Sequence, residues 1–193
     1  VDDALDLIEF ANGSSSTKWG GIRASLGHEK SFGLEYIGIG NEEVCEPFFE
    51  RYPLFHKAIK EKYPDIKIIN TASPFAAGGE YERGWKSARE NHSDLIDEHY
   101  YMSPEWFIAN QHRYDNFKKD DTKVFLGEYA TWGNTWYNAL VEAGYMTGLE
   151  RNAGKVALAC YAPMLCHVDY VNWKPDMIWY NNHQVYGTPN YYV

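Results

Sequence analysis

The chain has 193 residues, enough for one substantial core but fewer than the roughly 250 that a complete eight-stranded β/α barrel usually needs. Its 18 Lys and Arg residues against 27 Asp and Glu residues give a formal charge of -9, which argues against a nucleic-acid-binding surface because such surfaces are basic. The three cysteines form no disulfide framework and no zinc-binding CxxC pair, and no apolar run is long enough to cross a membrane. We therefore expect no metal, no cofactor, and neither a nucleic acid nor a membrane as a partner.

Helical patterns and short apolar runs alternate along the chain. The spacing of apolar residues predicts helices over residues 1–12, 18–26, 48–62, 81–90, 104–114 and 136–152. Apolar, β-branched runs predict strands over residues 34–39, 67–71, 95–100, 123–129 and 156–162. The remaining stretch, residues 169–193, is aromatic and irregular, and we expect loops there with a turn at 186–189.

Alternating strands and helices indicate βαβ units on a parallel sheet. Two architectures fit this pattern: an open doubly wound sheet and part of a closed barrel. No glycine-rich phosphate-binding turn follows any predicted strand, which weakens the open sheet that binds nucleotides. No linker or low-complexity segment interrupts the pattern, so we expect residues 1–193 to form a single domain.

Two of the predicted strands deliver a glutamate at their C-terminal ends, Glu42 and Glu128. Glutamate has low strand propensity and is costly to bury, although solvent exposure or pairing with Lys or Arg explains a single case equally well. Here the two are accompanied by Asn41 and by the cluster that contains His99 and Tyr101, on strand ends that meet at one edge of the sheet. Paired carboxylates are what glycoside hydrolysis requires, one as an acid and the other to attack or stabilise the anomeric carbon.

Several segments resemble family 51 glycoside hydrolases, the α-L-arabinofuranosidases. The resemblance is carried mainly by Tyr-Ile-Gly-Ile-Gly-Asn-Glu (36–42), Asp-Glu-His-Tyr-Tyr (97–101) and Val-Phe-Leu-Gly-Glu-Tyr-Ala (124–130). It extends to Tyr-Gly-Thr-Pro-Asn-Tyr-Tyr-Val (186–193) and so runs from end to end of the chain. It implies a (β/α)8 TIM-type barrel, of which this chain would cover about strands four to eight, without the N-terminal strands and the β-sandwich domain.

The same resemblance implies a retaining, two-step double-displacement mechanism and a role for each site residue. Glu42 would be the general acid/base and Glu128 the nucleophile, with their carboxyl groups about 5–5.5 Å apart. The substrate-binding residues would be Asn41, His99, Tyr101, Trp132 and, in a loop that departs from the family pattern, Trp173.

The activity implied by the resemblance is release of terminal α-L-arabinofuranosyl residues from arabinose-containing oligosaccharides or polysaccharides. Two alternatives stay open: another barrel glycosidase, such as a xylosidase or an endo-glucanase, and a non-catalytic carbohydrate-binding fragment. The chain starts without Met inside a helical pattern, so we expect its native N-terminus to lie further upstream. We also expect the open edges of an incomplete barrel to be covered by a homo-oligomer or by the remainder of the same polypeptide.

Overall fold

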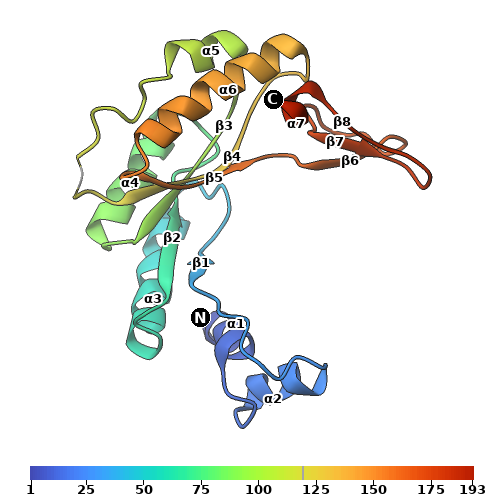
Figure 1. The fold of residues 1–193 in the computed structure, drawn as a ribbon. Coiled ribbons are helices and arrows are strands. Elements are labelled where there is room, and N and C mark those ends of the chain that lie inside the picture. Colours follow the sequence, from blue (N-terminus) through green and yellow to red (C-terminus); the bar gives the residue numbers. More distant parts are fainter. Residues whose placement is uncertain (119) are drawn as a thin grey trace.

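Five parallel strands form the main sheet of the computed structural model, which describes residues 1–118 and 120–193. In sheet order, which is also chain order, they are β1 (Tyr36–Gly38), β2 (Lys67–Thr71), β3 (Leu95–Met102), β4 (Lys123–Thr131) and β5 (Val156–Tyr161). The helices are α1 (Asp2–Asn12), α2 (Lys18–Ser25), α3 (Glu46–Lys62), α4 (Gly79–Glu90), α5 (Pro104–Ala109), α6 (Trp136–Arg151) and α7 (Pro189–Tyr192) (Figure 1). The predicted alternation of strands and helices is therefore confirmed.

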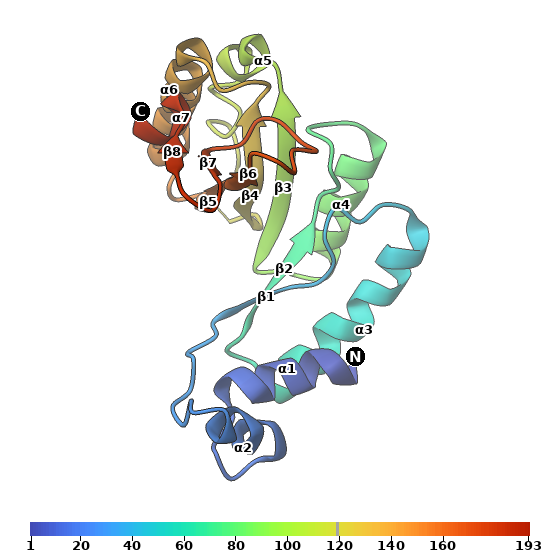
Figure 2. The ribbon, with the colours of Figure 1, turned by 90° about the vertical axis from the view of Figure 1, so that its right-hand side faces the viewer.

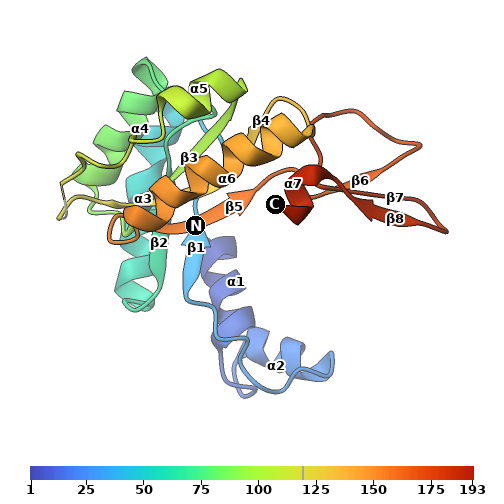
Figure 3. The ribbon, with the colours of Figure 1, turned by 45° about the horizontal axis from the view of Figure 1, so that its top comes forward.

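The strand order identifies the architecture as part of an α/β barrel. Each strand pairs with the next one along the chain, so the order never reverses, whereas a doubly wound sheet reverses at its switch point. Right-handed crossovers in one direction place every connecting helix on the same face. Figure 2 shows α3 and α4 along one side of the first strands, and Figure 3 shows α6 beside β4 and β5. The face of the main sheet that carries no connecting helix can therefore form the concave, inner side of a barrel.

The C-terminal segment differs from the expected loops. It forms a second sheet of three short strands, β6 (Leu165–His167), β7 (Ile178–Tyr180) and β8 (Val185–Gly187), which projects away from the main sheet (Figure 1). β6 pairs with β7 in parallel, and β7 pairs with β8 in antiparallel orientation. The prediction of an irregular end was wrong because three-residue strands are too short to show a period in the sequence.

The helix expected over residues 104–114 is also shorter in the structure. Ser103 caps α5 by accepting from the backbone N–H of Trp106, and the helix ends at Ala109, before a run of turns. The turns bring Arg113 and Tyr114 back against β3. By contrast, α6 starts as predicted, at a capping box formed by Thr135 and Asn138.

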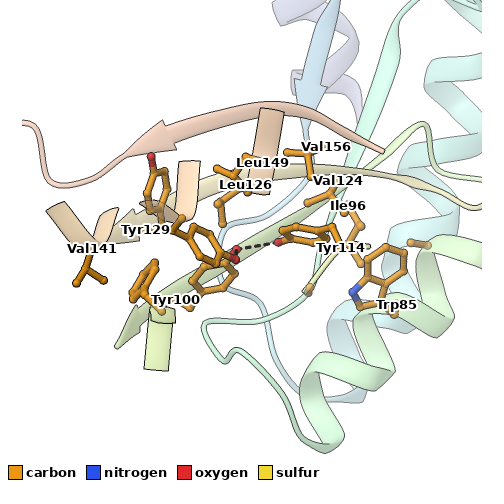
Figure 4. Packing of buried hydrophobic residues seen from close by; sticks show 14 residues of the cluster. Trp85, Ile96, Tyr100, Tyr114, Val124, Leu126, Tyr129, Val141, Leu149 and Val156 are labelled. Atoms are coloured by element: carbon orange, nitrogen blue, oxygen red, sulfur yellow. Dashed lines mark hydrogen bonds between the residues drawn. The ribbon is translucent and has the colours of Figure 1, made fainter. Parts of the chain in front are cut away.

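Two apolar cores hold the elements together. The larger lies between β3, β4 and the helices α4 to α6, and Figure 4 shows how tightly its aromatic rings pack. Three of its buried tyrosines hydrogen-bond to one another, since the hydroxyl of Tyr100 lies 2.8 Å from those of Tyr114 and Tyr145. The smaller core joins α1 and α3 to β1 and β2. Among the described residues, no helix is both long and apolar enough to cross a membrane.

A buried carboxylate, Glu98, ties the larger core to β3. The residue is 1% exposed, and each of its oxygens accepts two hydrogen bonds. One oxygen accepts from Tyr81 at 2.7 Å and from Trp85 at 2.9 Å. The other accepts from Tyr114 at 2.7 Å and from Arg113 at 3.2 Å. These four donors replace the water that a carboxylate loses on burial, and so offset the cost of burying its charge.

Glu98→Ala should therefore weaken the fold strongly, because it leaves the guanidinium of Arg113 buried without its counter-charge. We expect a loss of about 3–5 kcal/mol in the free energy that protects β3 from opening. Native-state hydrogen exchange of the β3 amides in the complete protein measures it. Glu61→Ala is the matched control, since Glu61 makes only an exposed pair with Lys57. Equal effects of the two substitutions would contradict the structural role of Glu98.

The two edges of the main sheet generate a second prediction. Within the described residues, β1 pairs only with β2, and β5 pairs only with β4. Unpaired edges and the apolar surface beside them promote association with other chains. Residues 1–193 produced alone should therefore self-associate and show little hydrolytic activity. Analytical ultracentrifugation and an arabinofuranoside assay test this, and a fully active monomer would contradict it.

Candidate active site

The first site residue, Glu42, lies in a constrained loop directly after β1. Its backbone φ is +53°, and those of Gly40 and Cys45 in the same loop are +81° and +70°. A side chain rarely adopts this left-handed region unless its surroundings impose it. Glycine is needed at position 40, because a Cβ there would come within 2.5 Å of Glu43 and 2.8 Å of Phe48. The loop therefore holds the Glu42 backbone in one unusual conformation.

The second site residue, Glu128, lies inside β4, next to two side chains from β3. Tyr101 donates a hydrogen bond of 2.6 Å to Oε2 of Glu128. His99 is 2% exposed and lies between the two glutamates, with Nδ1 3.0 Å from Oε1 of Glu42 and 3.8 Å from Oε2 of Glu128. One carboxylate oxygen of each glutamate and Nδ1 of His99 all lie within 4.8 Å of one another. The structure thus brings together Glu42, Glu128, His99 and Tyr101.

This closeness requires a curved sheet. β1 and β4 are separated by β2 and β3, and three strand spacings of about 4.8 Å would hold them roughly 14 Å apart in a flat sheet. Inward curvature of the kind found in barrels brings the side chains of the two strands together. A carboxylate oxygen of each glutamate within 4.8 Å of the other is consistent with the short spacing, about 5–5.5 Å between carboxyl groups, of retaining pairs.

Electrostatics favour a protonated His99 and a neutral Tyr101. Burial alone would lower the pKa of His99, but the hydrogen bond and charge of Asp97, followed by Glu42 and Glu128, raise it to about 9. Burial and the hydrogen bond to Glu128 raise the pKa of Tyr101 well above its usual range, so this hydroxyl stays a donor. A positive imidazolium next to two carboxylates offsets their mutual repulsion.

Aromatic side chains form a wall beside the pair. The ring centroids of Tyr101, Trp132 and Trp173 lie 5.2–6.0 Å apart, so the three rings contact one another. They line a cleft of about 460 Å³ together with Glu42, Glu128, Pro74 and Pro163. Trp132 and Trp173 remain 48% and 41% exposed, so their faces are accessible to a ligand. The second sheet contributes here, since Trp173 lies in the connection between β6 and β7.

Asn41 has a less defined place. Its side chain is exposed next to Glu42, and it is not among the residues that line the cleft of the described chain. A contact between Asn41 and a sugar hydroxyl therefore stays a prediction.

The triad of Glu42, His99 and Glu128 has the donor types and spacing that could hold a divalent ion. Each donor already has a protein partner, however. Glu42 pairs with His99, and Glu128 accepts from Tyr101. We interpret the group as a hydrogen-bonded carboxylate pair and do not assign metal ligands.

Two residues behind the site, Asp97 and Gly127, belong to the predicted strands but were assigned no role from the sequence. Asp97 lies 3.0 Å from Nε2 of His99 and accepts from the backbone N–H of Gly127 at 3.0 Å. Strand alternation offered a signal for Asp97, because residues two apart, such as 97, 99 and 101, face the same side. A glycine inside a predicted strand is likewise a recognised signal of a bulge.

Comparison with known proteins agrees with this geometry. Residues 1–119 match the family model described as the α-L-arabinofuranosidase 1 domain, and residues 127–193 match the α-L-arabinofuranosidase C-terminal domain. An extracellular exo-α-L-arabinofuranosidase of Streptomyces chartreusis is 49% identical over 194 residues, 100% of this chain and 24% of that protein. α-L-Arabinofuranosidase 1 of Arabidopsis thaliana is 35% identical over 199 residues, 100% of this chain and 28% of the relative. The chain thus spans about a quarter of the length of these relatives.

Solved structures show the same relationship. An arabinose-bound family 51 α-L-arabinofuranosidase superposes with a TM-score of 0.85 at 31% identity, over 99% of this chain and 32% of the other. The α-L-arabinofuranosidase of Thermotoga maritima, in its arabinose complex, gives a TM-score of 0.71 at 19% identity, over 98% and 45% of the two chains. At that identity the second likeness concerns the fold alone. Since one family model covers 119 of the 193 residues, the chain belongs to the α-L-arabinofuranosidases of glycoside hydrolase family 51.

Proposed function

We propose that this chain carries the catalytic pair of a retaining glycoside hydrolase that releases terminal α-L-arabinofuranosyl residues from arabinose-containing oligosaccharides or polysaccharides. The observation that carries the proposal is the approach of Glu42 and Glu128 to within 4.8 Å at the mouth of an aromatic cleft. Family membership supports the choice of sugar, since the relatives from Streptomyces chartreusis and Arabidopsis thaliana bear the name α-L-arabinofuranosidase.

In the first step, Glu128 attacks the anomeric carbon while Glu42 donates a proton to the departing glycosidic oxygen. The carbon–oxygen bond to the leaving group breaks, and an ester bond to Glu128 forms. Tyr101 supports this role, because its hydrogen bond holds one carboxylate oxygen and orients the other for attack. In the second step, Glu42 takes a proton from water, and the water oxygen attacks the anomeric carbon. The ester bond to Glu128 breaks, which frees both the Glu128 carboxylate and arabinose.

The aromatic wall supports recognition of the sugar. Tryptophan presents a broad apolar face on which the C–H groups of a sugar ring can pack. Trp132 and Trp173 are partly exposed and line the same cleft as the nucleophile, and are therefore proposed as substrate-binding residues. Asn41 is proposed to contact a sugar hydroxyl from its place next to Glu42.

The place of the chain in a complete barrel is also a proposal. We assign β1 to β5 to strands four to eight of a (β/α)8 barrel, which puts Glu42 after the fourth strand and Glu128 on the seventh. We further propose that residues 1–193 belong to one catalytic domain. Pairing of β3 with β4 supports this, because the continuous sheet crosses the boundary between the two matched family models.

The two glutamates should respond differently to removal in the complete protein. Glu128→Ala should abolish turnover of every substrate, because no covalent intermediate can form. Glu42→Ala should slow substrates with poor leaving groups by about 10²–10⁴-fold, the usual contribution of general acid–base catalysis. It should spare the first step with activated aryl arabinofuranosides, and azide should then restore turnover by attacking the intermediate. Steady-state kinetics with and without azide measure both effects.

Glu43→Ala provides the matched control, since it removes the neighbouring glutamate and should leave most of the activity. Equal losses for Glu42→Ala on activated and unactivated substrates, without azide rescue, would contradict the acid/base assignment. A panel of aryl glycosides tests the sugar separately. Preference for a xyloside or a glucoside would keep the mechanism and overturn the substrate.

A further inference from the structure

A partly buried chain of hydrogen bonds runs behind the two glutamates. The backbone N–H of Gly127 donates to Oδ1 of Asp97 at 3.0 Å, and Oδ2 of Asp97 lies 3.0 Å from Nε2 of His99. The other ring nitrogen of His99 lies 3.0 Å from Oε1 of Glu42. Neither Asp97 nor Gly127 lines the cleft, so neither is placed to contact a ligand there.

We propose that Asp97 is a positioning residue that fixes the orientation and the Nε2–H tautomer of His99, so that His99 and Glu42 share one proton. This inference rests on the proposed function, because it gives the shared proton its role in the two hydrolytic steps.

The register of the sheet explains why Asp97 can reach both partners. β3 and β4 pair Glu98 with Leu126 and then His99 with Glu128, so Gly127 is an extra residue in β4. Such a bulge is typical of strands next to active sites, where it redirects a side chain. Without it, position 127 rather than Glu128 would lie opposite His99. The bulge therefore brings the nucleophile next to His99 and aims the Gly127 N–H at Asp97.

Only glycine leaves room for this arrangement. A Cβ at position 127 would lie 2.1 Å from Oδ1 of Asp97, far closer than nonbonded atoms approach. The carboxylate of Asp97 thus occupies the space that any other residue would fill. Gly127 and Asp97 therefore depend on each other, because a side chain at position 127 and the carboxylate of Asp97 cannot occupy the same space.

The chemistry of the three groups determines where the proton lies. An ionised carboxylate only accepts, so Nε2 of His99 must donate to Asp97. Nδ1 then faces Glu42 either as an acceptor from a protonated carboxyl or as a donor to a carboxylate. In both forms the pair of His99 and Glu42 holds one proton between its atoms. The opposite tautomer would place an N–H toward Glu42 and leave Nε2 facing Asp97 without a proton.

The groups that face His99 from each neighbouring element favour this state. They are Asp97 and Tyr101 on β3, Glu128 on β4 and Glu42 after β1, and the three carboxylates supply only negative charge. Cys160 on β5 lies near Asp97, and burial, followed by the charge of Asp97, raises its pKa, so it stays neutral. The pKa of about 9 for His99 agrees with this surrounding charge.

In the reaction, the shared proton passes from Glu42 to the glycosidic oxygen, and any proton on Nδ1 moves to Glu42 as it does so. The second step returns one proton from water to Glu42. The pair therefore ends the cycle with as many protons as it began with, and His99 exchanges its proton with Glu42 and not with the substrate.

Asp97→Asn in the complete protein tests the proposal, because the amide keeps the shape of the side chain but cannot accept from both partners. We expect kcat on substrates with poor leaving groups to fall by about 10²-fold, with KM nearly unchanged. The alkaline limb of the pH profile reports loss of the shared proton. Asp97 raises that pKa, so its removal should move the limb to lower pH by about 1–3 units. Asp65→Asn, an exposed change at the other end of the sheet, is the matched control.

A spectroscopic readout separates this inference from the proposed function. In protein with ¹⁵N-labelled histidine, His99 should titrate near pH 9, and its neutral form above that midpoint should be the Nε2–H tautomer. Asp97→Asn should lower the midpoint or change the tautomer. The His99→Gln variant assigns the resonance. An inactive wild-type protein would overturn the proposed function while the resonance still tested Asp97. An unmoved resonance and an unmoved alkaline limb in Asp97→Asn would overturn the present proposal.

A double-mutant cycle tests whether Gly127 and Asp97 act as one unit. Gly127→Ala should lower kcat much as loss of Asp97 does, because the added methyl group displaces the carboxylate. In the Asp97→Ala background that methyl group meets no carboxylate, so the double variant should lose little more than Asp97→Ala alone. Losses that add in full would show that the two residues act independently and would overturn the chain of contacts.

Discussion

The alternation of side chains along β3 is the constraint on which both the core and the site depend. Ile96, Glu98 and Tyr100 face the helices, where they are almost fully buried. The residues between and after them, Asp97, His99 and Tyr101, face the opposite side and contact the two glutamates or each other. Because the period of a strand is two residues, any shift of β3 by one position would exchange the two sets. The strand therefore cannot lose its register without losing fold and site together.

The buried network on the helix side explains how β3 stays in register. Four donors from α4 and from the turns after α5 converge on Glu98, and three tyrosine hydroxyls meet at Tyr100. Directional bonds of this kind specify one position of a strand, whereas apolar contacts alone tolerate small slips. A site whose groups must be held within fractions of an ångström benefits from such support. Polar groups on the helix side thus support the strand that carries the site, although none of them lines the cleft.

How much of this could be predicted depends on the range of the interactions. The strand at 67–71 was predicted with its observed bounds, because an apolar run between a Pro-Asp turn and a polar stretch is a local signal. The two glutamates were predicted from their place after apolar runs, and the resemblance added their roles and Tyr101. The 2.6 Å hydrogen bond from Tyr101 to Glu128 is consistent with a place for Tyr101 in the site. The second sheet was missed because its strands have only three residues each, and β6 pairs in parallel with β7 across the connection 168–177 and not through a short hairpin. No role was predicted for Asp97, because its contact with the Gly127 N–H depends on the register between β3 and β4.

The distance between the glutamates is the feature least accessible from the sequence, and the structure shows why. The two residues are not brought together by a single loop. Glu128 lies inside β4 and Glu42 follows β1, with two strands between them. Their separation is the sum of the twist and curvature of four strands, a collective property that no single segment encodes. The bulge at Gly127 has a local effect in addition, since it shifts the register of β4 by one residue so that Glu128 pairs with His99. Curvature therefore brings the two carboxylates into range, and one glycine completes their alignment.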